Sequence, residues 1–144
     1  MEFGAIEREI YIEATPEVVF DVVSSPEHIK GWWPDGASYS LVPGEPGQIN
    51  FGDKVEQFTV VEAKPPAMFR FRWTHAPGEV AAAGNSLLVT FELTPSGAGT
   101  MLRMTETGFR ERGWEAAVLE QSFNDHVSGW DHFLPRLAPY AEKL

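Results

Sequence analysis

The stretch EAAVLEQSFNDHVSGWDHFLPRLAPY, residues 115–140, decides the fold. Its apolar and aromatic side chains recur three or four positions apart, which predicts one face of an amphipathic helix. This face comprises Leu119, Phe123, His126, Trp130, Phe133, Leu137 and Tyr140. Because proline removes a backbone donor and crowds the preceding turn, we expect a kink or a restart at Pro135. The remaining chain must supply a surface that covers this apolar face.

Most of the preceding chain is predicted to form short strands. A period of two, which is typical of a strand, runs through residues 6–13, where Ile6, Arg8, Ile10 and Ile12 alternate with Glu7, Glu9, Tyr11 and Glu13. Further strands are predicted near residues 38–42, 47–51, 54–62, 67–75, 86–93 and 100–107. After the first strand, Thr15-Pro16-Glu17 and Ser25-Pro26-Glu27 are start signals for two short helices. A long helix that follows such strands buries its apolar face against their sheet.

The predicted fold class is therefore α+β, as one domain over residues 1–144. A curved antiparallel sheet of about six or seven strands wraps the long C-terminal helix, and the two short helices close one end. Such a shape often leaves an apolar hollow between helix and sheet. We expect an opening near Trp33 and the small-residue loop at residues 76–84. The predicted ligand-binding residues are Trp33, Phe71, Trp73, Phe91, Met104, Phe123, His126 and Trp130.

Three polar residues are candidates for proton transfer in this hollow. Glu106 shares a predicted face with Leu102 and Met104, where a carboxylate is costly unless it is paired or near water. The alternative is that Glu106 is exposed at the open end of the sheet. His126 either lines the hollow or bonds to backbone or water in the core, and with Glu106 it could form an acid–base pair. His75 either touches a ligand at the mouth or is a solvated residue at a strand end.

Composition narrows the class of protein. Hydrophobic residues make up 43% and charged residues 22%, which is typical of a soluble globular protein. The formal net charge of −10 disfavours nucleic acid and anionic membranes as partners. The absence of cysteine excludes disulfides and thiolate chemistry. Because residues 1–8 do not resemble a signal peptide and no apolar run is long enough to span a membrane, we expect a cytoplasmic location without membrane insertion.

No metal or other cofactor is expected. The four histidines, at positions 28, 75, 126 and 132, do not have the spacing of a metal site, and no cysteine supplements them. The turn Pro43-Gly44-Glu45-Pro46-Gly47 has an acidic centre, which does not suit phosphate.

The order of several motifs resembles a known family, the stand-alone bacterial proteins related to the activator of heat-shock protein 90 ATPase. These belong to the START-like, or SRPBCC, superfamily of helix-grip folds. The motifs are residues 14–20, Trp32-Trp33-Pro34, Pro65-Pro66 before an aromatic strand, residues 105–109, and Gly129-Trp130. The resemblance implies a deep apolar cavity under the long helix. It does not imply one activity, because superfamily members bind lipids, hormones or polyketides and some are aromatases or cyclases.

Three hypotheses about function follow. The preferred one is a binding protein that holds a small apolar or aromatic molecule between helix and sheet. The second is an aromatase/cyclase-like or hydrolytic enzyme that uses the same cavity. The third is a chaperone-associated or other protein-interaction module, including a homodimer that uses exposed aromatic residues. In the eukaryotic activator, chaperone stimulation depends heavily on a separate N-terminal domain outside these 144 residues, so the resemblance does not carry a chaperone role to this chain.

Overall fold

The computed structural model describes residues 2–144, in which seven strands form one antiparallel sheet. The strand order across the sheet is β1-β7-β6-β5-β4-β3-β2. The strands are β1 (Ala5–Ile12), β2 (Gly36–Ser38), β3 (Pro46–Phe51), β4 (Lys54–Lys64), β5 (Met68–Trp73), β6 (Leu87–Ser96) and β7 (Gly99–Thr107). The helices are α1 (Pro16–Ser24), α2 (Pro26–Ile29), the short 3-10 helix η1 (Arg110–Arg112) and α3 (Ala116–Glu142). The predicted α+β helix-grip fold is confirmed.

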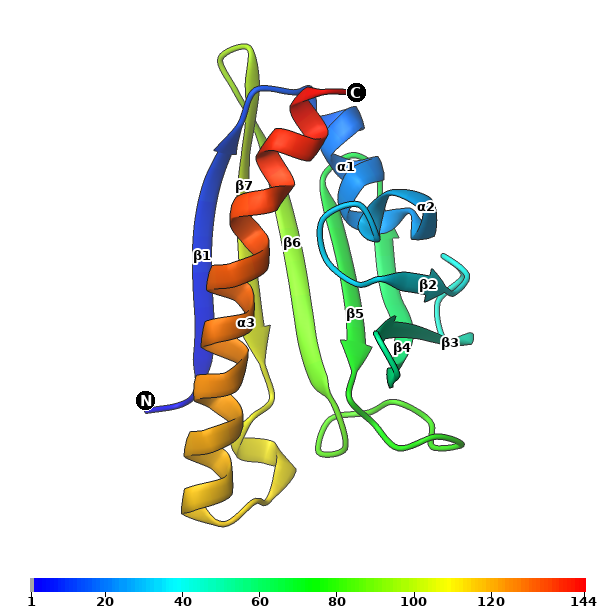
Figure 1. Cartoon of the computed structure of the whole chain (residues 1–144), viewed down its shortest axis with the longest axis vertical. Helices are drawn as coiled ribbons and strands as arrows, with labels where there is room; N and C mark the ends of the chain where they lie inside the picture. The colour runs from blue at the N-terminus through cyan, green and yellow to red at the C-terminus, as the bar shows by residue number, and fades with distance from the viewer. Residues whose placement is uncertain (1) are drawn as a thin grey trace.

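All three α-helices lie on the same side of the sheet (Figure 1). The long helix α3 crosses the part of the sheet formed by β1 and β7, and its C-terminal end meets α1. Helix α1 packs on β5, β6 and β7, and α2 lies against β2. The first helix begins as predicted, because Thr15 Oγ1 accepts a hydrogen bond from the backbone N–H of Val18 at 3.3 Å and Pro16 occupies the first turn.

One predicted strand is displaced. Strand β2 was expected near residues 38–42, but it covers Gly36–Ser38 and pairs with β3. The chain turns away after Tyr39, whose hydroxyl donates to the Ser24 carbonyl at 2.6 Å. Gly44 then takes a φ of 88°, a left-handed conformation that favours a turn over an extended strand.

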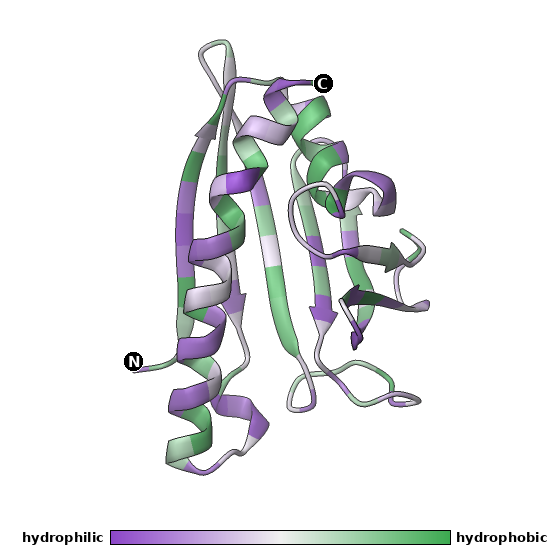
Figure 2. Cartoon of the chain, viewed as in Figure 1, coloured by the Kyte–Doolittle hydropathy of each residue, from purple (hydrophilic) through white to green (hydrophobic). Residues whose placement is uncertain are grey.

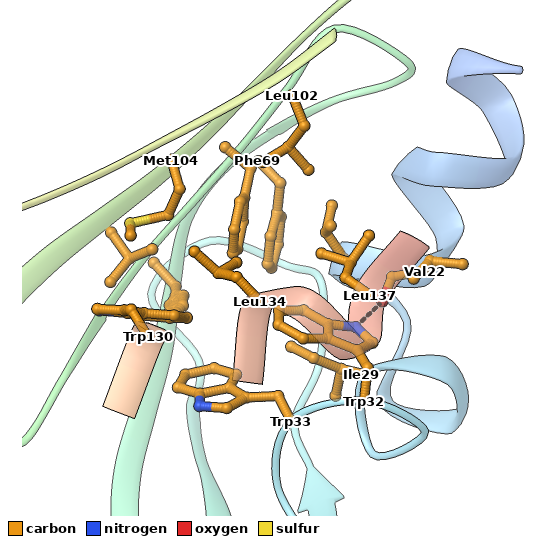
Figure 3. Packing of buried hydrophobic residues seen from close by; sticks show 14 of the residues in the cluster. Val22, Ile29, Trp32, Trp33, Phe69, Leu102, Met104, Trp130, Leu134 and Leu137 are labelled. Carbon is orange, nitrogen blue, oxygen red and sulfur yellow. Dashed lines mark hydrogen bonds between the residues drawn. The ribbon is translucent and has the colours of Figure 1, made fainter. Parts of the chain in front are cut away.

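The C-terminal half of α3 contributes several side chains to the apolar core. Trp130, Leu134, Leu137 and Ala141 are buried, and Figure 3 shows the first three beside Trp32 and Trp33. Leu134 is therefore buried where Phe133 was predicted to be, because the next buried residue after Trp130 follows four positions later. The helix does not restart at Pro135, and Figure 1 shows its axis leaning toward α1 over the last turns.

The N-terminal half of α3 is less covered. Hydrophilic and hydrophobic residues alternate along the helix (Figure 2), and none of residues 116–129 is fully buried. Arg8 on β1 holds this helix through a hydrogen bond from Nε to Asp131 Oδ1 at 2.8 Å, which lowers the pKa of Asp131. Arg8 is partly exposed and Asp131 is exposed, so solvent screens this pair and it adds little stability. No helix within residues 2–144 is both long and apolar enough to cross a membrane.

Candidate functional site

A fully buried carboxylate lies under the middle of α3. Glu106 on β7 is 0% exposed and accepts three hydrogen bonds. Oε2 accepts from the indole N–H of Trp73 at 2.7 Å. Oε1 accepts from the indole N–H of Trp130 at 2.8 Å and lies 2.9 Å from Nδ1 of His126. The expectation that Glu106 is exposed at the end of the sheet is therefore wrong, because three donors compensate the cost of burying it.

Regular secondary structure brings these four residues together. Thr100, Leu102, Met104 and Glu106 alternate on β7 and are all buried, as strand parity predicts. His126 and Trp130 are four residues apart on α3 and therefore lie one turn apart on the same face. Trp73 is the last residue of β5 and reaches Glu106 across the intervening strand β6. Each donor is thus fixed by a packed element.

The hydrogen-bond pattern suits one protonation state of the group. An ionised carboxylate only accepts hydrogen bonds, and three N–H donors around two oxygens suit that form. With Glu106 as the acceptor, Nδ1 of His126 carries the proton. In the neutral imidazole, the second nitrogen, Nε2, is then an acceptor. The pair can therefore hold a proton or accept one at Nε2 of His126.

A pocket of about 590 Å³ lies beside this group, between the N-terminal half of α3 and strands β3 to β6. The aromatic residues Trp33, Trp73, Trp114, Trp130, Phe51 and Phe133 line it. The other lining residues are Lys54, Glu56, Thr74, Leu87, Arg112, Ser122, Asp125, His126 and Gly129. The volume lies within the range of about 300–1,000 Å³ that is common among small-molecule pockets.

Four of the eight predicted ligand-binding residues line this pocket, namely Trp33, Trp73, His126 and Trp130. Trp33 forms part of its floor and stacks on Trp130, with ring centroids 5.0 Å apart. Trp33 also stacks on Phe71, with ring centroids 5.6 Å apart. Whether any of these residues binds a ligand stays a prediction.

The other four predicted residues lie elsewhere. Phe71, Phe91 and Met104 are completely buried and do not line the pocket. Trp33 covers Phe71, and Trp130 packs edge-on against Phe91. Phe123 instead contacts Phe109, with ring centroids 5.0 Å apart. Strand parity gave the correct face for the first three, but it does not say how deep a residue lies beneath the tryptophans.

His75 is neither solvated nor part of the pocket. It is buried, and its Nε2 lies 3.3 Å from the hydroxyl of Thr59. Burial lowers the pKa of His75; the charge of Glu79 opposes this effect and the charge of Arg112 adds to it. The preceding residue, Thr74, has a φ of 69°, which interrupts the strand alternation that was expected to extend through His75.

The mouth of the pocket also differs from the expected one. Its rim includes Phe51, Lys54 and Glu56 of the β3–β4 hairpin, and no residue of the loop at 76–84. Across the mouth, Arg112 donates to the hydroxyl of Thr74 at 3.1 Å and its guanidinium lies 4.7 Å from the ring of Trp114. Within residues 2–144, no three His, Asp or Glu side chains are grouped to hold a metal ion.

The chain matches a known protein family over most of its length. The family described as Activator of Hsp90 ATPase homolog 1-like protein matches residues 13–142. The chain belongs to this family. The resemblance noted in the sequence is therefore confirmed. No curated protein matches the chain in sequence.

Several solved structures share the fold of this Activator of Hsp90 ATPase homolog 1-like chain. Protein MLL2253 from Mesorhizobium loti has 21% sequence identity and a TM-score of 0.78, over 96% of this chain and 97% of that one. The Aha1 dimer from Colwellia psychrerythraea has 20% identity and a TM-score of 0.73, over 96% of both chains. DynU16, from the dynemicin biosynthetic locus, has 22% identity and a TM-score of 0.72, over 96% of this chain and 47% of that one. At these identities the likeness shows the fold alone.

Several pocket residues of this family member were not predicted from its sequence. Phe51 and Phe133 face each other with ring centroids 5.7 Å apart, and Trp114 precedes α3. The aromatic character of the three was visible, but only the packing of the β3–β4 hairpin near α3 shows that they share a wall. A Cβ atom added at Gly129 would meet no atom within 4 Å outside the backbone of the helix and the adjoining residues.

Proposed function

We propose that the protein binds a small apolar or aromatic molecule in the pocket between α3 and the sheet. The observation that carries this proposal is an open, aromatic-walled space of about 590 Å³ beside Gly129. Proteins fill most apolar space with their own side chains, so a space of this size beside a packed core is a candidate binding site. The family to which the chain belongs has a fold that suits such a role.

The walls favour a flat, apolar guest. Phe51 and Phe133 lie next to each other and present partly exposed rings, while Trp33, Trp73 and Trp130 form a nearly buried floor. Aromatic rings offer large contact areas at a low cost in conformational entropy, and they stack on aromatic ligands at offset or edge-on geometries. Charged residues of both signs also line the pocket, and Lys54 lies 3.6 Å from Glu56.

Gly129 allows a test that spares the core. The side chain of leucine at this position would project into space that no atom occupies within 4 Å of its Cβ. We expect Gly129→Leu to weaken binding of the dye 8-anilinonaphthalene-1-sulfonate by at least about tenfold, because the new side chain fills the pocket. The measurement is a fluorescence titration of the dye at constant protein concentration.

The control is Ser128→Leu, which adds the same side chain to the exposed side of the same helix. This variant should bind the dye as the parent does, and circular dichroism should show that both variants retain the fold. Saturable binding by the parent that Gly129→Leu does not weaken would place the dye elsewhere and contradict the proposal. No saturable binding by the parent would favour the protein-interaction hypothesis.

A second candidate function is supported by the bond between Glu106 and His126. A carboxylate that orients a histidine beside a pocket is an arrangement used for proton transfer, which fits an aromatase/cyclase-like or hydrolytic enzyme. In this proposal His126 exchanges the proton and Glu106 positions it. His75 has no part in it, because it does not line the pocket. Turnover of a candidate substrate that is lost in His126→Asn but retained in His132→Asn would support the enzyme.

Two further expectations belong to this proposal. We place the protein in the cytoplasm, on the basis of its composition. We also consider assembly as a homodimer, since the fold is shared with the Aha1 dimer from Colwellia psychrerythraea. Sedimentation equilibrium would distinguish a dimer from a monomer.

A further inference from the structure

We propose that the bound molecule carries a hydrogen-bond donor, such as a phenolic or enolic hydroxyl, which it gives to Nε2 of His126. This inference rests on the proposed function and specifies the chemistry of the ligand. A purely apolar site would not require the buried hydrogen-bonded group formed by Glu106, His126, Trp73 and Trp130.

The imidazole of His126 is held in a fixed orientation. Nδ1 of His126 lies 2.9 Å from Glu106 Oε1, and the same oxygen accepts the indole N–H of Trp130 at 2.8 Å. The rings of Trp73 and Phe109 pack against the imidazole, with centroids 5.2 Å and 5.4 Å away. These contacts hold the ring in one orientation, and the carboxylate holds the proton on Nδ1.

The other ring nitrogen of His126, Nε2, is available as an acceptor. Nε2 makes no hydrogen bond with any side chain or backbone group between residues 2 and 144, yet it is not among the buried polar atoms that lack a partner. It therefore retains accessible surface. The side chain of His126 is 20% exposed and lines the pocket. An acceptor with a fixed direction is thus presented to whatever occupies the pocket.

Leaving this acceptor without a partner would lower the affinity for a guest. A guest without a polar group would displace water from Nε2 and leave it without a partner, which loses binding free energy. A guest that places a hydroxyl there replaces the water and keeps the hydrogen bond. The surrounding tryptophan and phenylalanine rings require the rest of the guest to be apolar. Together these conditions describe a hydroxylated aromatic molecule.

The test compares 2-naphthol with naphthalene, two probes that share an aromatic frame and differ by one hydroxyl. Their dissociation constants are measured by equilibrium dialysis with the parent protein, His126→Asn and His132→Asn. The amide nitrogen of asparagine lies close to the place of Nδ1, so it can still donate to Glu106, while nothing replaces Nε2. The control makes the same change at an exposed histidine of the same helix that does not line the pocket.

We expect the parent and His132→Asn to bind 2-naphthol more tightly than naphthalene by a factor of about three to ten, the effect of one hydrogen bond. In His126→Asn this preference should disappear, because no acceptor remains at the place of Nε2. Comparing the two preferences cancels the difference in hydration between the probes. In the free parent, nitrogen-15 NMR of neutral His126 should show a proton on Nδ1 and none on Nε2.

The other outcomes would overturn either this inference or the proposed function. If both probes bind saturably and the preference is the same in His126→Asn as in the parent, the hydroxyl is not recognised by His126 and the inference is overturned, although the pocket still binds. If neither probe binds saturably to the folded parent, the proposed function itself fails. A neutral His126 with its proton on Nε2 would also overturn the inference, because the ring would then offer a donor to the pocket.

Discussion

Replacing Glu106 with glutamine is expected to lower the free energy of unfolding by about 3 kcal/mol. Glutamine has nearly the same shape, but one of its two terminal groups is an NH2 that donates. The indole N–H groups of Trp73 and Trp130 and Nδ1 of His126 all point at the two carboxylate oxygens. At least one N–H would therefore face another donor in a site from which water is excluded.

Urea denaturation measures this effect, with the slope of the transition used to confirm that the variant unfolds in the same way. The matched control is Glu92→Gln on the neighbouring strand β6, where the side chain is exposed. The control should stay within about 0.5 kcal/mol of the parent. A loss below about 1 kcal/mol for Glu106→Gln would mean that water or a rearranged side chain satisfies the orphaned donor.

Trp130→Ala is expected to lower the free energy of unfolding by about 3–5 kcal/mol. The indole is 2% exposed, stacks on Trp33 and donates its N–H to Glu106. Its removal leaves a cavity under α3 and also removes a hydrogen bond from the buried carboxylate. Denaturant melts of the parent and the variant measure the difference.

Trp114→Ala is the comparison for this variant. Trp114 is only partly buried and contacts Arg112 at the mouth of the pocket. Its truncation should cost much less stability, because the surrounding solvent can fill the space. Equal losses for the two tryptophans, or a loss below about 1 kcal/mol for Trp130→Ala, would show that Trp130 is not a central part of the core.

The fold could be predicted from the sequence because its signals are local. The alternation of β7 places Glu106 inward beside Met104, and the spacing of α3 places His126 and Trp130 on one face. Such periods follow from backbone geometry and hold wherever one face is buried. One exception is β2, which ends at Ser38, just before Tyr39 bonds through its hydroxyl to the distant Ser24 carbonyl.

The candidate site was less predictable because it depends on long-range contacts. The donors that make the burial of Glu106 tolerable are Trp73 and Trp130, which are 33 and 24 positions away in the chain. Strand parity shows which side a residue faces, but the stacking of Trp33 between Phe71 and the pocket determines what lines the surface. Nothing in the residues around Gly129 indicates the empty space beside it.

The unequal burial of α3 has a consequence for its motions. Its C-terminal half contributes Trp130, Leu134 and Leu137 to the core, whereas Ala116, Ala117 and Val118 at the other end are exposed. Amide protons should exchange with deuterium sooner in residues 120–129 than in residues 130–141, because the first turns can fray without disturbing the core. The part of the pocket wall that precedes Trp130 thus opens more readily than the part from Trp130 onward. A guest could enter through such fraying, and once bound it would slow exchange in those turns.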